Sequence, residues 1–116
     1  MEIKLVKDPI ELKELGEMAQ NGFGDFVKVV VDIEQKIMAV GGELHADIEV
    51  VLVEKCSSKR ENTWGINIYP KMPGEDMIEF DSMVNIKPFF GNRSRGVENP
   101  EIRDRIREIC RSLIKI

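Results

Sequence analysis

The sequence predicts an α+β domain in which an antiparallel β-meander of about five strands carries the N- and C-terminal helices on one face. Short segments in the middle of the chain alternate apolar and polar residues with a period of two, which indicates strands with one buried face. Both ends carry helix-start signals followed by apolar residues at helical spacing. Turn-forming Gly and Pro residues separate these segments.

The composition is typical of a single globular domain, residues 1–116. Of these residues 42% are hydrophobic and 33% are charged, and the length allows a core to form without disulfides or metal. Cys56 and Cys110 lie far apart without a CxxC motif, which predicts free thiols. Neither a signal peptide nor an apolar run of about 20 residues is found. We therefore expect a cytoplasmic protein that does not bind membranes.

The first helix is expected to run from Asp8 to about Gln20, after a short strand at residues 3–6. Asp8 is a suitable N-cap, and Pro9 suits the first helical position because no N–H is needed there. Apolar residues follow at helical spacing: Leu12, Leu15, Met18 and Ala19. Gly22 ends the helix.

Two strands, at residues 26–33 and 37–40, are expected to form a hairpin. Gly41 and Gly42 then supply the positive φ angles that a two-residue hairpin turn requires. The segment that follows the turn, 43–55, would be the third strand of the meander.

Residues 43–55 fit two structures. They alternate as a strand does, but Leu44, Ile48 and Leu52 also follow helical spacing. The valines and the preceding Gly-Gly turn favour the strand. A helix here would instead give a ferredoxin-like βαββαβ arrangement.

The last two strands are expected at residues 63–70 and 77–87. If the intervening loop closes a hairpin, Asn67 lies opposite Glu79 or Asp81 on the polar face of the sheet.

The final helix is expected to begin at Asn99, with Pro100 in its first position. Arg103, Arg107 and Arg111 would form a basic ridge along it. The sequence pI of 5.1 and the 6% aromatic content do not favour nucleic-acid binding by this ridge.

Several segments together resemble a family of small uncharacterised prokaryotic proteins that is grouped as a domain of unknown function. They are FGD at 23–25, VDIE at 31–34, GGELHAD at 41–47, WGINIYP at 64–70 and GNRSRGV at 91–97. The resemblance covers nearly the whole chain and implies a bacterial or archaeal cytoplasmic protein. It implies no activity and identifies no catalytic residue.

His45, Asp47 and Glu49 alternate along the expected third strand and form one candidate site. With Glu79 or Asp81 nearby they would give an oxygen-rich set with one imidazole, which suits Mn²⁺, Fe²⁺ or Mg²⁺. Alternatively, His45 would act as a general base that a carboxylate orients. The simplest explanation is the polar, solvated face of an antiparallel sheet.

Asn92, Arg93 and Arg95 form a second candidate site, in a glycine-flanked loop before the last helix. Guanidinium groups and exposed backbone N–H groups bind phosphate and carboxylate. Residues 1–88 contain 10 Lys/Arg and 17 Asp/Glu, whereas residues 89–116 contain 7 and 4. The simpler explanation is therefore a surface loop whose arginines pair with the acidic body.

Five apolar residues are expected on the otherwise polar sheet face: Val30, Met38, Val40, Val51 and Val53. A second subunit or another part of the chain would cover such a patch, so a homodimer is one expectation.

Two functions are therefore carried forward. The first is a small binding module that recognises an anionic group through Arg93 and Arg95. The alternative is a metal-assisted hydrolase that uses the His45, Asp47 and Glu49 face together with Glu79. The sequence does not decide between them and leaves the identity of any cofactor open.

Overall fold

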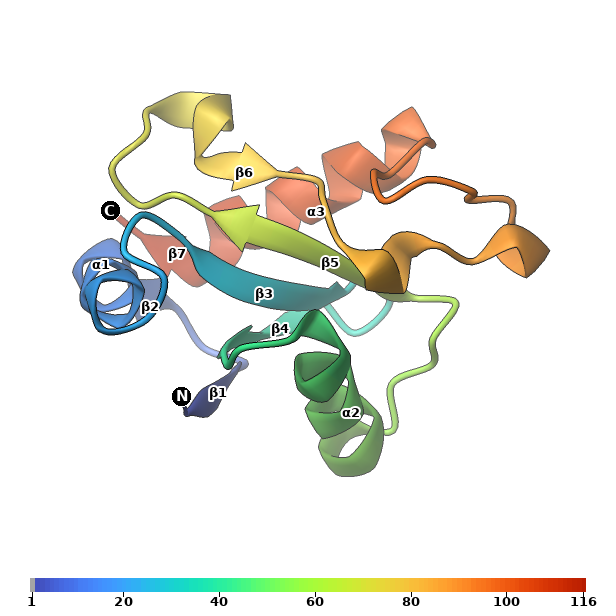
Figure 1. The fold of residues 1–116 in the computed structure, drawn as a ribbon, viewed down its shortest axis with the longest axis horizontal. Coiled ribbons are helices and arrows are strands. Elements are labelled where there is room, and N and C mark those ends of the chain that lie inside the picture. Colours follow the sequence, from blue (N-terminus) through green and yellow to red (C-terminus); the bar gives the residue numbers. More distant parts are fainter. Residues whose placement is uncertain (1) are drawn as a thin grey trace.

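The structure is a computed structural model that describes residues 2–116, and it shows a five-stranded antiparallel sheet with helices on both faces (Figure 1). The strands lie in the order β1 (Ile3–Val6), β4 (Ile37–Gly41), β3 (Val27–Asp32), β5 (Thr63–Ile68) and β6 (Ile78–Glu79). The helices are α1 (Leu12–Asn21), α2 (His45–Cys56) and α3 (Pro100–Leu113). A short parallel pair joins β2 (Ile10–Glu11) to β7 (Ile114–Lys115). The predicted α+β class with a five-stranded antiparallel sheet is confirmed.

The larger core lies between the sheet and the two terminal helices. Val29, Val31 and Ile66 of the sheet are fully buried against Leu15 of α1 and Ile106 of α3. Alternate residues of a strand point to the same face, so the period-two pattern places this apolar set on one side. The predicted packing of both terminal helices on one face is confirmed.

Residues 45–56 form helix α2, so the preferred strand at 43–55 is wrong. This helix forms a smaller core with the opposite face of the sheet. Ile48 and Leu52 of α2 pack against Val30, Ile37 and Ala39 of the sheet. A helix brings residues four apart onto one side, so these two side chains cover a strip of the sheet. A strand at 43–55 would have left that strip exposed to water.

The loop of the β3–β4 hairpin is one residue longer than the predicted strands at 26–33 and 37–40 imply, which shifts the register by one residue. Val31 pairs with Met38, and Val30 pairs with Ala39, because the loop spans residues 33–36. A one-residue shift moves every side chain to the other face. Met38 therefore lies in the larger core, while Val30 is buried beneath α2. Of the apolar patch that suggested a homodimer, three residues are thus buried in the two cores, while Val51 and Val53 are half-buried on α2.

Helix starts were predicted with mixed success. Helix α3 begins as expected, and Asn99 accepts a hydrogen bond from the backbone N–H of Glu101 at 2.9 Å. Helix α1 begins only at Leu12, because the preceding residues pair with the C-terminal strand as β2, so Asp8 lies outside the helix. Among residues 2–116, no helix combines the length and the apolar character needed to cross a membrane.

Candidate binding site on the second face of the sheet

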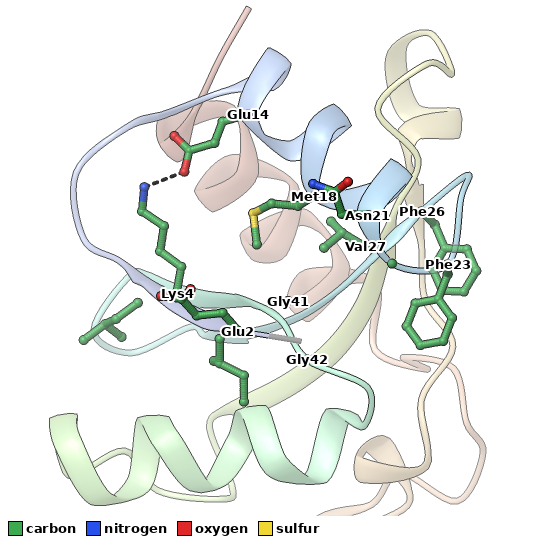
Figure 2. Close-up of a pocket in the computed structure, with 13 residues that line it drawn as sticks. Glu2, Lys4, Glu14, Met18, Asn21, Phe23, Phe26, Val27, Gly41 and Gly42 are labelled. Atoms are coloured by element: carbon green, nitrogen blue, oxygen red, sulfur yellow. Dashed lines mark hydrogen bonds and ion pairs between the residues drawn. The ribbon is translucent and has the colours of Figure 1, made fainter.

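A cavity of about 690 Å³ opens between α1 and the start of β1 (Figure 2). Its walls include Met18, Phe23 and Phe26, and an ion pair of 2.6 Å joins Lys4 to Glu14 beside it. It contains none of the candidate site residues that the sequence suggested. Those residues must therefore be located elsewhere on the molecule.

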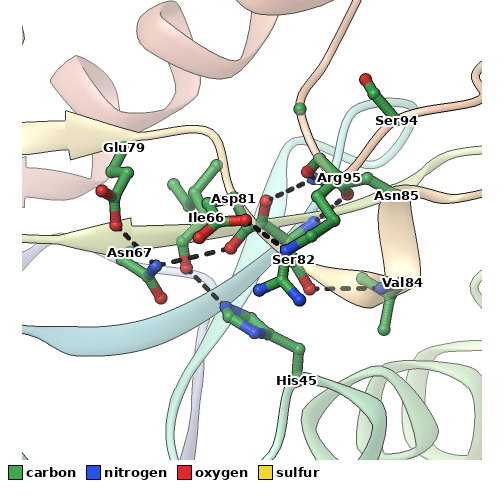
Figure 3. Close-up of polar contacts among 12 residues, drawn as sticks. His45, Ile66, Asn67, Glu79, Asp81, Ser82, Val84, Asn85, Ser94 and Arg95 are labelled. Carbon is green, nitrogen blue, oxygen red and sulfur yellow. Dashed lines mark hydrogen bonds and ion pairs between the residues drawn. The ribbon is translucent and has the colours of Figure 1, made fainter.

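Two segments cover the second face of the sheet. Helix α2 packs on β1, β4 and β3, and the segment Met83–Asn85 packs on β5, so that Thr63 and Asn67 of β5 are buried. Polar side chains lie beside this segment. Lys28, Asn67 and Glu79 are cross-strand neighbours on β3, β5 and β6, and His45 approaches from the start of α2 (Figure 3). We call the following six residues the polar face: Lys28, His45, Asn67, Glu79, Asp81 and Arg95.

Asn67 holds Glu79 in place. Its Nδ2 donates to Glu79 Oε1 at 2.9 Å and to the backbone oxygen of Asp81 at 3.4 Å. The Tyr69 hydroxyl donates to the same Glu79 oxygen at 3.1 Å. The predicted position of Asn67 opposite Glu79 is confirmed. Asn67 Oδ1 is buried and has no hydrogen-bond partner within residues 2–116.

Arg95 lies over the same face and is anchored by Asp81. Its Nε–H donates to Asp81 Oδ1 at 2.6 Å (Figure 3). The terminal nitrogens of the guanidinium point toward His45 in the same view. The positive charge of Arg95 contributes to lowering the pKa of His45.

Two buried asparagine amides bring Arg95 to the sheet. Asn85 replaces a strand partner of Gly65: its Oδ1 accepts from the Gly65 N–H at 2.8 Å and its Nδ2 donates to the Gly65 oxygen at 2.9 Å. Asn85 Nδ2 also donates to the Arg95 oxygen at 2.9 Å. Asn92 joins this segment to the loop, donating to the Asn85 oxygen at 2.7 Å.

His45 is neutral at physiological pH. Its Nε2 lies 2.8 Å from the backbone oxygen of Ile66, and this nitrogen carries the proton because a carbonyl only accepts. Burial lowers the pKa of His45, and the positive charges of Lys28 and Arg95 lower it further, against the opposing effects of the Ile66 carbonyl and Asp81. Nδ1 is then a hydrogen-bond acceptor.

An aromatic row borders the polar face. Phe23 stacks on Phe26 at 5.0 Å between ring centroids, and Phe26 lies 5.3 Å from Tyr69. Lys28 Nζ sits 4.8 Å from the Phe23 ring centroid and donates to the Glu43 oxygen at 2.6 Å. The row gives a bound molecule an apolar surface beside the charged groups.

The chain matches a family model whose description is Protein of unknown function (DUF5674), over residues 4–113. The chain belongs to the DUF5674 family. No curated protein and no solved structure matches it. The predicted resemblance to a domain of unknown function is confirmed, and the matched region includes the whole polar face of this DUF5674 protein.

The residues predicted to hold a metal are dispersed in the DUF5674 structure. His45 and Glu79 belong to the polar face, but Asp47 is exposed on another side of α2 because residues two apart in a helix diverge by about 200°. Glu49 is buried, and its Oε2 accepts from Thr63 Oγ1 at 2.7 Å. Over the described range, 2–116, no group of three or more His, Cys, Asp and Glu side chains is arranged to hold a metal ion.

Of the predicted anion loop, only Arg95 joins the polar face. Asn92 is buried, and its amide bonds four backbone groups around it. The backbone N–H groups of Arg93 and Ser94 both donate to Glu98 Oε2 at 2.8 Å, which lowers the pKa of Glu98. The backbone of the loop thus binds a carboxylate of its own chain.

The sequence analysis missed Lys28 and the meeting of His45 with Arg95. Lys28 could have been found from the alternation of β3, which places it on the same face as Val30. The approach of His45 depends on the helix at 45–56, so it follows only from the alternative structure for that segment.

Proposed function

We propose that this DUF5674 protein is a small binding module that holds an anionic group of its ligand between Arg95 and His45. The observation that carries the proposal is the orientation of Arg95, whose terminal nitrogens point across the polar face toward His45 (Figure 3). Arginine recognises carboxylate and phosphate through paired N–H groups. Lys28 adds a second positive charge close to His45.

The ion pair with Asp81 orients Arg95 without occupying it. Asp81 accepts from Nε–H alone, and a guanidinium has five N–H donors. The side chains of Arg95 and Asp81 are 53% and 44% exposed, and an exposed ion pair of this kind contributes little to stability. An incoming anion therefore shares the guanidinium and does not need to displace Asp81.

The test is an NMR titration of the labelled protein with acetate and with inorganic phosphate at constant ionic strength. We expect saturable shifts at the backbone amides of His45, Ile66 and Arg95. Arg95→Ala should abolish saturation, while Arg111→Ala, an exposed arginine on α3, should not. Because Arg95 donates its side chain only to Asp81, the variant should keep the wild-type spectrum elsewhere.

Two outcomes would contradict the proposal. Saturation that is unchanged in Arg95→Ala would show that the anion binds elsewhere. An equal loss in Arg93→Ala and Arg95→Ala would place the anion on the outer side of the loop, away from the polar face.

A further inference from the structure

We infer that the ligand of the polar face is a zwitterion, with a protonated amine bound by Glu79 and an anionic group bound by Arg95. This inference rests on the proposed function and extends it from an anionic group to a class of molecule. It follows from the way in which two opposite charges are held side by side.

Glu79 is oriented in the same manner as Arg95. Both of its hydrogen bonds, from Asn67 Nδ2 and the Tyr69 hydroxyl, go to Oε1. The carboxylate is therefore fixed through Oε1, and the Glu79 residue is exposed. A carboxylate held in this way is prepared to accept hydrogen bonds from an ammonium group.

A single amide links the two charges. Asn67 Nδ2 contacts both Glu79 and the backbone oxygen of Asp81, and Asp81 anchors Arg95. Figure 3 shows the Asn67 amide and the Asp81–Arg95 pair on one face of β5. One small molecule can thus reach both Glu79 and the guanidinium.

The charge balance of the polar face selects a ligand with both signs. Lys28 and Arg95 are positive, Glu79 and Asp81 are negative, and His45 is neutral because its pKa is lowered. A ligand that is only anionic meets repulsion from two carboxylates, and a ligand that is only cationic meets repulsion from Lys28 and Arg95.

The aromatic row also favours an amine. The Tyr69 hydroxyl contacts Glu79 Oε1, and the Phe26 ring lies 5.3 Å from the Tyr69 ring. Aromatic faces attract cations.

The test compares amino acids of increasing length with carboxylates that lack the amine. The titrants are glycine, β-alanine, 4-aminobutyrate and 5-aminovalerate, each paired with acetate, propionate, butyrate or valerate. We expect at least one amino acid to bind about tenfold more tightly than its matched carboxylate, as a charge-assisted hydrogen bond allows. The length that binds best measures the distance between the two charges.

Variants assign the two ends of the ligand. In Glu79→Gln the advantage of the amino acid should disappear while the carboxylate still binds, because glutamine keeps an oxygen that accepts from Asn67. Glu108→Gln, at an exposed position of α3, is the matched control and should keep the advantage. Arg95→Ala should weaken both members of each pair.

A failure of the zwitterion inference can be distinguished from a failure of the proposed anion binding. If every amino acid binds no more tightly than its carboxylate, the zwitterion inference is overturned and the anion-binding module stands. If no titrant shows binding that depends on Arg95, both proposals fail. An advantage that survives in Glu79→Gln places the amine elsewhere and also overturns the inference.

Discussion

Gly65 determines how closely residues 82–85, which hold the backbone of Arg95 through hydrogen bonds, approach the sheet. A Cβ at Gly65 would lie 2.5 Å from both Cβ and Oγ of the buried Ser82. We expect Gly65→Ala to destabilise the protein by about 1–3 kcal/mol, the usual effect of overpacking.

The matched control is Gly16→Ala in α1, where the nearest atom to the new Cβ is Pro70 Cβ at 4.0 Å. This variant should stabilise the protein by about 0.5–1 kcal/mol, because alanine loses less conformational freedom in a helix. Urea unfolding of both variants checks the two signs. Equal effects of the two substitutions would contradict the contact between Gly65 and Ser82.

His45 should give the protein a pH-dependent loss of stability in mild acid. Because the folded-state pKa lies below the ordinary value of 6.5, the unfolded chain binds a proton more readily than the folded chain. The free energy of unfolding therefore falls as the pH drops from about 7 toward the folded-state pKa. The quantity to measure is the difference in unfolding free energy between the wild type and His45→Gln, because the contributions of the other titratable groups cancel in this difference.

The unfolding free energy of the wild type relative to the variant should be constant above about pH 7. It should decrease as the pH falls from about 7 to about 5. Chemical denaturation at several pH values measures it. A difference that stays constant through the acid range would show that His45 keeps its ordinary pKa in the folded protein.

At the level of elements, helix α2 supplies His45 to the polar face and packs on the sheet through one side of the helix. Leu52 is fully buried against the sheet, whereas Val50 on the same helix is 41% exposed. Leu52→Ala should cost about 2–5 kcal/mol of stability, and Val50→Ala should cost under about 0.5 kcal/mol. Similar losses in the two variants, measured by urea unfolding, would contradict the observed face of α2.

The sequence predicted those elements whose signals are local. The start of α3 follows from Asn99 and Pro100, and the larger core follows from the alternation of β3. Residues 45–56 fit both the strand period and the helical period. Their structure is therefore decided by an apolar strip of β3 and β4, distant in sequence, that helix α2 buries. No local pattern contains that information.

The polar face likewise combines contacts that follow from local sequence signals with contacts that do not. Asn67 and Glu79 meet because strand register alone pairs them, and the sequence predicted this contact. Arg95 reaches Asp81 only because the amides of Asn85 and Asn92 hold an irregular segment against β5. Asparagines in loops are common, so their sequence positions alone did not reveal this role.

At the level of the whole molecule, the metal hypothesis has its own test. Since Asp47 and Glu49 do not join His45, we expect Mn²⁺, Zn²⁺ and Mg²⁺ to leave the melting temperature of the chelator-treated protein unchanged. A specific metal at 100 times its Kd would add about 2.7 kcal/mol and raise the melting temperature by several degrees. A rise that disappears in His45→Ala would favour the hydrolase hypothesis.

The polar face spans two parts of the molecule with unequal attachment. Lys28, His45 and Asn67 stand on elements fixed by the two cores. Glu79 and Arg95 belong to a largely irregular stretch that is attached through two residue pairs of β6, the Asn85 amide, Lys87, and the packing of Ile78, Phe80 and Val97 on the larger core. Such a stretch opens at a lower free energy than the core strands. Ligand binding would then shift the equilibrium between the open and closed forms of this stretch toward the closed form. The measured affinity would include the free energy needed to hold residues 78–98 against the sheet.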